Sequence, residues 1–297
     1  MNAHNGLPFT VDGLLPELDA PVLITQFTGW IDASGAAAAA MEALTSESHS
    51  TRLITFDADT FIDYRARRPV MELREGVNTN IEWSVPEIRV GRDSNGRDVL
   101  LLTGPEPDMA WNFFARTVAE LAQQMKVQKM VGLGAYPFGA PHTRPVGITA
   151  TSADPAVIQR LDLSKSTLDA PDGVQSLLEH TLMKCGIEAV SLWAQVPHYV
   201  ASMAYPLASD ALIQALCADT GLSFDSSRLR RESAVQRERL DQLVANNPEH
   251  AGMLQQLEAA YDEMHGAPIS DDTTDMPTVD ELAAEVEQFL RDQQSGG

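Results

Sequence analysis

The chain has 297 residues, with 42 acidic side chains against 21 basic ones and a formal net charge of -21 at pH 7. Nucleic-acid binding and docking on anionic lipid both depend on clustered lysine and arginine, so this charge argues against either partner. Two cysteines cannot make a disulfide framework or a four-ligand zinc site, and no stretch reaches the roughly 18 apolar residues of a membrane span. The first residues lack the basic and apolar regions of a signal peptide. We therefore expect a soluble, cytoplasmic protein without a bound metal or cofactor.

Apolar residues make up 44% of the chain, which is ample for a buried core. The largely apolar run at 21–27 is typical of a buried strand, and the alanine-rich segment from Ala33 to Leu44 favours a helix, with Asp32 as its N-cap. A second apolar run at 51–56 predicts the next strand. This strand–helix–strand order indicates a crossover within a parallel sheet, and therefore an α/β fold.

Residues 57–103 change to short alternating runs, which predict a β-rich insertion that returns into a central strand at 99–103. The dipeptide Asn95-Gly96 is the strongest turn signal in the chain and predicts a hairpin between 86–91 and 98–103. Beyond it, apolar periodicity predicts helices and strands in alternation. The expected helices are Met109–Met125, 172–185 with Asp172 as a cap, and 207–219, and the expected strands are 128–133, 147–151 and 187–194, with a long Gly- and Pro-rich loop reaching Arg144.

From Phe224 the composition turns polar and helical, and Asn246-Asn247-Pro248 separates two segments with apolar stripes, which predicts an antiparallel helical hairpin. The last 29 residues hold eight acidic residues and one arginine, with an amphipathic helix expected at 278–293. We therefore divide the chain into an α/β/α core domain at 1–222, a helical hairpin subdomain at 223–267, and an acidic linker with a C-terminal helix at 268–297.

Polar and aromatic clusters follow several of the predicted strands. Ligands bind outside the carboxyl ends of the strands in open α/β sheets, so these clusters are expected to converge on one edge as a ligand or partner site. The candidate residues are Gly29, Trp30, Asp32, Asp63, Tyr64, Arg67, Arg68, Glu106, Asp108, Trp111, Gly134, Tyr136, His142, Arg144 and His198.

Each cluster also has a structural interpretation. Asp32 and Asp108 can simply cap helices, and the arginines at 65–68 can belong to an internal ion-pair network or a subunit contact. A single loop histidine is more often structural or solvated than chemically active. The sequence contains no Walker loop, nucleophile elbow or His-Glu-x-x-His helix, so it indicates no particular reaction.

Four motifs, in this order, resemble the actinobacterial form of the proteasome assembly chaperone 2 family over about residues 15–265. The motifs are Gly29-Trp30-x-Asp32-Ala33, Asp63-Tyr64-x-x-Arg67-Arg68-Pro69, Gly104-Pro105-Glu106-Pro107-x-x-x-Trp111 and Gly132-x-Gly134-Ala135-Tyr136-Pro137 continuing to His142-Thr143-Arg144-Pro145. The resemblance implies a three-layer α/β/α core with a mixed, largely parallel sheet, similar to nucleoside phosphorylases and related hydrolases, in an oligomeric protein.

The eukaryotic members of that family are non-enzymatic chaperones that pair to scaffold the proteasome α-ring. They end in a hydrophobic-Tyr-any tail, whereas this sequence ends Gln294-Ser295-Gly296-Gly297, so the same docking mode is not expected. The resemblance to phosphorylases carries no activity with it, because function depends on sites and not on folds.

Two functions remain as hypotheses. The favoured one is a non-enzymatic assembly chaperone or scaffold that acts as a homo-oligomer, with a trimer as one candidate and proteasome subunits as candidate partners. The alternative is a small-molecule binding protein or a phosphorylase- or hydrolase-like enzyme for a nucleoside, phosphate or carboxylate. Its crevice would be formed by Asp32, Arg67, Arg68, Asp108, His142 and Arg144.

Overall fold

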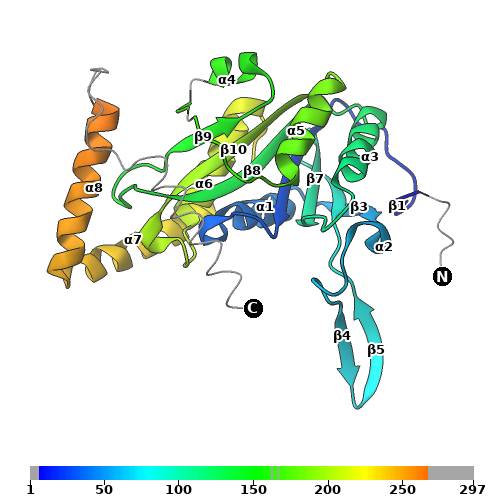
Figure 1. The fold of residues 1–297 in the computed structure, drawn as a ribbon, viewed down its shortest axis with the longest axis horizontal. Coiled ribbons are helices and arrows are strands. Elements are labelled where there is room, and N and C mark those ends of the chain that lie inside the picture. The colour runs from blue at the N-terminus through cyan, green and yellow to red at the C-terminus, as the bar shows by residue number, and fades with distance from the viewer. Residues whose placement is uncertain (1–6, 162, 166, 267–297) are drawn as a thin grey trace.

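A computed structural model describes residues 7–161, 163–165 and 167–266, and the predicted acidic linker and helix at 278–293 lie outside this part (Figure 1). Its strands are β1 (Phe9–Val11), β2 (Val22–Thr28), β3 (Thr51–Phe56), β4 (Val70–Arg74), β5 (Val77–Glu82), β6 (Glu87–Arg92), β7 (Asp98–Pro105), β8 (Lys129–Phe138), β9 (Ile148–Thr151) and β10 (Glu188–Pro197). Its helices are η1 (Ala33–Gly35), α1 (Ala36–Glu47), α2 (Ala58–Phe61), α3 (Trp111–Gln124), α4 (Pro155–Leu161), α5 (Val174–Lys184), η2 (His198–Val200), α6 (Pro206–Thr220), α7 (Ser227–Ala245) and α8 (Pro248–Gly266).

The main sheet of the described chain has eight strands in the order β1-β3-β6-β7-β2-β8-β10-β9. The central strands β7, β2, β8 and β10 run parallel, whereas β1, β6 and β9 are antiparallel to their neighbours. The predicted mixed, largely parallel sheet is therefore confirmed. The crossover from β2 through α1 leads to a strand of the same direction, but β7 and β6 lie between the two.

Helices cover both faces of this sheet, which makes the predicted three layers (Figure 1). Residues of the central strands alternate between two separate core clusters, since successive side chains of a strand point to opposite faces. Ile24 belongs to the cluster under α1 and α6, and its neighbour Leu23 belongs to the cluster under α3 and α5. Buried parallel strands read as continuous apolar runs, which explains why the sequence identified them.

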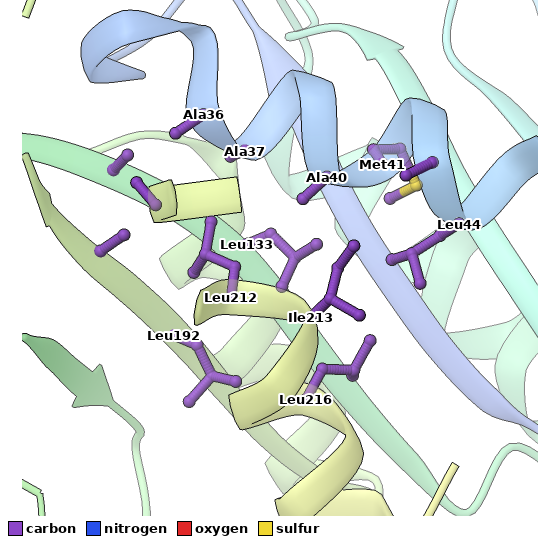
Figure 2. Packing of buried hydrophobic residues seen from close by; sticks show 14 of the residues in the cluster. Ala36, Ala37, Ala40, Met41, Leu44, Leu133, Leu192, Leu212, Ile213 and Leu216 are labelled. Atoms are coloured by element: carbon purple, nitrogen blue, oxygen red, sulfur yellow. The ribbon is translucent and has the colours of Figure 1, made fainter. Parts of the chain in front are cut away.

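The alanine-rich face of α1 allows a close approach between this helix, α6 and the sheet. Its alanines are short enough for the larger side chains of α6 to pack against them, over leucines of β8 and β10. Figure 2 shows this contact with Ala36, Ala37, Ala40, Met41 and Leu44 of α1 above Leu212, Ile213 and Leu216 of α6 and Leu133 and Leu192 of the sheet.

Ala40→Leu is expected to destabilise the protein by about 1–3 kcal/mol, because a well-packed core resists added methylene groups. Ala40 is fully buried in the contact with α6. Urea unfolding monitored by circular dichroism measures the change, and Glu42→Leu on the exposed face of the same helix is the control. Equal stabilities for the two variants would show that this contact accommodates the larger leucine side chain without strain.

The predicted β-rich insertion forms two different structures. Asn95-Gly96 joins β6 to β7 as expected, with Gly91 opposite Val99, and β7 is a central strand of the sheet. The strands β4 and β5 instead pair only with each other and project away from the main sheet as a separate antiparallel hairpin (Figure 1).

Two predictions near the C-terminal half need correction. The strand predicted at 128–133 continues to Phe138, so the first residues of the expected Gly- and Pro-rich loop belong to β8. The helices α7 and α8 are present and meet near Asn246, but Figure 1 shows them diverging from their shared end and not lying antiparallel. Leu229 and Leu240 of α7 extend the core cluster under α6. No helix in the described residues combines the length and apolarity needed to cross a membrane.

Candidate functional site

The first candidate residues lie at the end of β2, where the chain turns sharply. Gly29 has φ +105, a backbone angle that favours glycine, and a Cβ placed there would lie 2.7 Å from Nη2 of Arg67, whose side-chain end would have to shift. The Asp32 carboxylate binds the start of α1: its Oδ1 accepts from the Ala37 N–H at 2.8 Å and its Oδ2 from the Ala38 N–H at 2.9 Å. The Asp32 carboxylate thus caps the first long helix through its side chain, although Gly35 holds the N-cap position that was predicted for Asp32 and a 3-10 turn intervenes.

Asp108 does not cap α3, contrary to one of the two interpretations of this residue. The N-cap position is occupied by Ala110 in a left-handed conformation. The Asp108 carboxylate instead accepts hydrogen bonds from the Nε–H of Arg67 and the backbone N–H of Asp63, each at 2.9 Å. This pair fixes the segment that leads into the β4–β5 hairpin, and it uses the arginine that was expected to bind an anion.

Glu106 is the most buried acid at this edge, at 8% exposure. One carboxylate oxygen accepts from the N–H of Val174 at 2.5 Å, so Glu106 supplies the cap of α5 that was expected from Asp172. Burial raises the pKa of Glu106, the Val174 N–H and the nearby Arg67 lower it, and the negative charges of Asp172 and Asp108 raise it again. The carboxyl group therefore serves as a structural hydrogen-bond acceptor, and its surroundings have opposing effects on its pKa.

A narrow cleft lies beside Glu106, between β2, β8, β10 and the start of α5. Its volume of about 20 Å³ holds roughly one water molecule and no nucleoside. Two tryptophans line it, and Gly134 leaves room for one of them, since a Cβ there would meet the Trp193 ring at 2.3 Å. The cleft is lined by Phe27, Trp30, Ile31, Glu106, Leu133, Gly134, Asp172, Gly173, Gln175 and Trp193.

The remaining residues of the first three clusters have packing roles. Tyr64 hydrogen-bonds Asp59, and its ring contacts that of Trp83 in a tilted arrangement, with ring centroids 4.5 Å apart, at the base of the hairpin. Trp111 donates its indole N–H to the Pro107 carbonyl at 2.5 Å and packs against the core under α3. Arg68 is exposed.

His142 and Arg144 belong to a second, separate group that faces the C-terminal helices. His142 is 2% exposed; its Nδ1 lies 2.7 Å from the Tyr199 hydroxyl and its Nε2 lies 3.1 Å from Oδ1 of Asp241 on α7. Arg144 holds α8, with Nε and Nη2 at 2.8 and 2.6 Å from the Asp262 carboxylate, and a longer contact of 3.3 Å to Glu258. Asp241 lies on α7 and Asp262 lies on α8, so this loop after β8 binds both C-terminal helices.

Tyr136 and His198 form no ion pair with either group in the described part of the chain. Tyr136 lies within β8, and its hydroxyl accepts from Nε2 of Gln195 at 3.0 Å. His198 is exposed, with its ring edge-on to Tyr199. The described residues hold no cluster of three or more His, Cys, Asp or Glu side chains suited to a metal ion.

The structure therefore brings the predicted residues to one edge of the sheet but not into one crevice. Arg67, Asp108 and Glu106 form the first group, and His142 and Arg144 form the second. In both groups the charged side chains bind one another, backbone N–H groups, or side chains of the C-terminal helices. The partners on α5, α7 and α8 were missed because no local pattern links residues about a hundred positions apart.

The fold defines a class: a three-layer α/β/α domain with a projecting hairpin and added C-terminal helices. The chain belongs to the PAC2 family, whose model matches residues 26–244. The expected resemblance is thus confirmed.

Solved structures of similar proteins cover most of the chain. A Mycobacterium tuberculosis protein of unknown function, Rv2714, is 31% identical with a TM-score of 0.79, covering 87% of this chain and 92% of its own. A Corynebacterium glutamicum protein of unknown function is 27% identical with a TM-score of 0.80, covering 87% and 98%. The M. tuberculosis proteasome-assembly chaperone homologue Rv2125 is 28% identical with a TM-score of 0.72, covering 78% and 99%. No curated protein matches the chain.

Proposed function

We propose that this chain is a cytoplasmic, non-enzymatic assembly chaperone or scaffold that acts through protein–protein contacts as a homo-oligomer. Membership of the PAC2 family and the likeness to a proteasome-assembly chaperone homologue support the chaperone role and make proteasome subunits the candidate clients. The observation that carries the proposal is the apolar face of the β4–β5 hairpin.

This hairpin has one predominantly apolar face. Met71 pairs with Ile81 across the two strands, and Leu73 follows two positions along β4, so these three side chains share a face; Trp83 comes just after the end of β5. Their exposures are 53%, 47%, 53% and 42%. An isolated two-stranded hairpin is only marginally stable in water, and contiguous exposed apolar surface of this kind marks interaction sites. A second protein surface would stabilise the hairpin by covering this face.

Self-association through this face is expected to be lost in the double variant Leu73→Glu/Ile81→Glu, because two buried carboxylates would face one another or a neighbouring apolar surface. Light scattering after size exclusion would then give the monomer mass of 32.3 kDa, against a larger closed oligomer, with a trimer as one candidate, for the wild type. Asn80→Glu, on the opposite face of the same hairpin, is the control and should leave the mass unchanged. A monomeric wild type would contradict the homo-oligomer.

The chaperone role is tested with purified proteasome α and β subunits and the intact wild-type chain. We expect crosslinking to capture at least one subunit type and the chain to change the rate at which rings form. The chaperone role would be overturned if crosslinking captured no subunit and the assembly rate did not change, with subunits that assemble by themselves. The homo-oligomer is tested separately, by the light-scattering measurement described above.

A further inference from the structure

An open groove of about 260 Å³ lies between α7 and the start of α6, apart from the narrow cleft beside Glu106. Most of its surface is apolar, and Leu207 of α6 and the buried Leu240 of α7 form part of its lining. Exposed residues of α7, Ala234 and Arg237 among them, form one rim, so the groove is accessible from solvent along that helix. Apolar grooves of this kind bind amphipathic helices, whose anchoring side chains recur three, four and seven residues apart.

The rim of this groove carries positive charge in a strongly acidic protein. The sequence of α7 contains five arginines and three acidic residues, whereas the whole chain has a net charge of -21. Arg230 and Arg237 line the groove seven residues apart, which places them on one side of the helix, about 10 Å apart along its axis. Arg237 forms no ion pair with the described residues, and the contacts of Arg230 with Asp210 and Asp225 are long, at 3.8 Å each. The groove therefore favours an occupant with an apolar stripe flanked by carboxylates.

Residues 278–293 of the same chain, which lie outside the described part, have that pattern. Their apolar residues recur at helical spacing and are Leu282, Val286, Phe289 and Leu290. In a helix, Glu285 and Asp292 would lie along one side of this stripe. These two acids are seven residues apart, which is also the spacing of the two groove arginines. Both the apolar stripe and the acidic side of the segment therefore match the groove.

The position at which the described chain ends allows this segment to reach the groove. His142 lines the groove, and two residues further on Arg144 binds Asp262 in the last turns of α8. Gly266 lies four residues beyond Asp262, so it is within roughly 30 Å of His142 along this path. The eleven residues at 267–277 span up to about 36 Å when extended, which is longer than that path.

We propose that residues 278–293 bind back in the groove between α6 and α7 as an amphipathic helix, with their acidic side beside Arg230 and Arg237. The groove holds about two or three side chains of leucine or phenylalanine size, which the apolar stripe supplies. Binding removes apolar surface from water and pairs carboxylates with the rim arginines. The groove is thus an interaction surface for an acidic helix, occupied by the chain's own segment, and this inference goes beyond the proposed chaperone role.

Hydrogen exchange of the full-length protein, followed by mass spectrometry, tests this binding, with the isolated peptide 278–293 as the unbound reference. Amides of this segment should exchange about 10-fold or more slowly in the protein than in the peptide. Arg237→Glu should bring the exchange rate to within about 2-fold of the peptide, because it places a negative charge beside the acidic side of the helix. Val286→Asp, which puts a charge in the apolar stripe, should have the same effect.

Each variant has a matched control. Arg239→Glu makes the same charge change as Arg237→Glu, and Arg239 is exposed on the same helix without lining the groove. Ala284→Asp makes the matching change to Val286→Asp, but on the opposite side of the predicted helix. Both controls should keep the slow exchange, and circular dichroism of every variant establishes that the fold is retained. Exchange in the wild type as fast as in the peptide would overturn the proposal, as would equal losses in Arg237→Glu and Arg239→Glu.

The hairpin variant Leu73→Glu/Ile81→Glu separates this inference from the proposed homo-oligomer. Its 278–293 segment should exchange as slowly as that of the wild type, because the groove and the segment belong to one chain. Fast exchange in this variant alone would mean that the segment binds a neighbouring copy, and would overturn binding within the chain. A monomeric wild type with slow exchange would contradict the homo-oligomer and support the inference.

Discussion

Replacing Asp219 by alanine is expected to lower the free energy of unfolding by about 3–5 kcal/mol, because it leaves a buried cation with too few counter-charges. Lys129 begins β8 and is 8% exposed, with its Nζ against the Asp219 carboxylate and 2.7 Å from Glu188 at the start of β10. Arg160 of α4 completes the group, at 2.9 Å from Asp219 and 2.6 Å from Glu188. The network thus ties two helices to the amino ends of two strands.

Urea unfolding measures this effect, and a second variant separates the buried charge from simple loss of packing. Lys129→Met/Asp219→Leu removes both charges and should recover most of the stability, since apolar residues can replace a buried ion pair at little cost. Glu232→Ala is the matched control: it breaks an exposed pair with Arg228 at 2.9 Å and should cost well under about 1 kcal/mol. If the double variant were as unstable as Asp219→Ala, the insufficiently compensated charge of Lys129 would not be the cause.

Local patterns predicted those parts of the fold that depend on near neighbours in the chain. The apolar run of β2, the Asn95-Gly96 turn and the amphipathic spacing of α3 all act within a few residues, and all three elements are present. The predicted end of β8 was wrong because that strand continues alongside β10, with Pro137 opposite Val196. Strand ends depend on the partner strand, which the local composition of a Gly- and Pro-rich segment does not reveal.

The candidate site shows the same division. Asp32 caps the adjacent helix, as its position in the sequence indicates. Asp108 was open to the same interpretation but binds Arg67, 41 residues away. Glu106 caps a helix 68 residues away, and Arg144 pairs with Asp262, 118 residues away. The sequence predicted that these residues gather at one edge of the sheet, but side-chain pairing between distant elements decides which groups remain for a ligand.

Glu179→Gln is expected to stabilise the protein at pH 8 and to have little effect at pH 5. Glu179 lies on α5, is 3% exposed, and accepts from the Thr151 hydroxyl at 3.0 Å. Burial raises its pKa to about 7, although the nearby hydroxyls of Ser191 and Thr151 act in the opposite direction and the charge of Asp172 adds to the rise. The folded protein therefore holds a proton that the unfolded chain, with a pKa near 4.5, releases earlier.

The direction of the pH dependence follows from that difference. Between about pH 4.5 and 7 the folded state binds more protons than the unfolded state, so the wild type loses stability as the pH rises, by up to about 3 kcal/mol in total. Glutamine keeps the shape and does not ionise, so the variant should escape this loss. Urea unfolding of both proteins at several pH values measures the gap, and Glu120→Gln, an exposed acid on the neighbouring α3, is the control. Parallel stability curves for wild type and Glu179→Gln would mean that the buried carboxyl is not the group that titrates, whereas a gap that opens only above pH 5 would identify it.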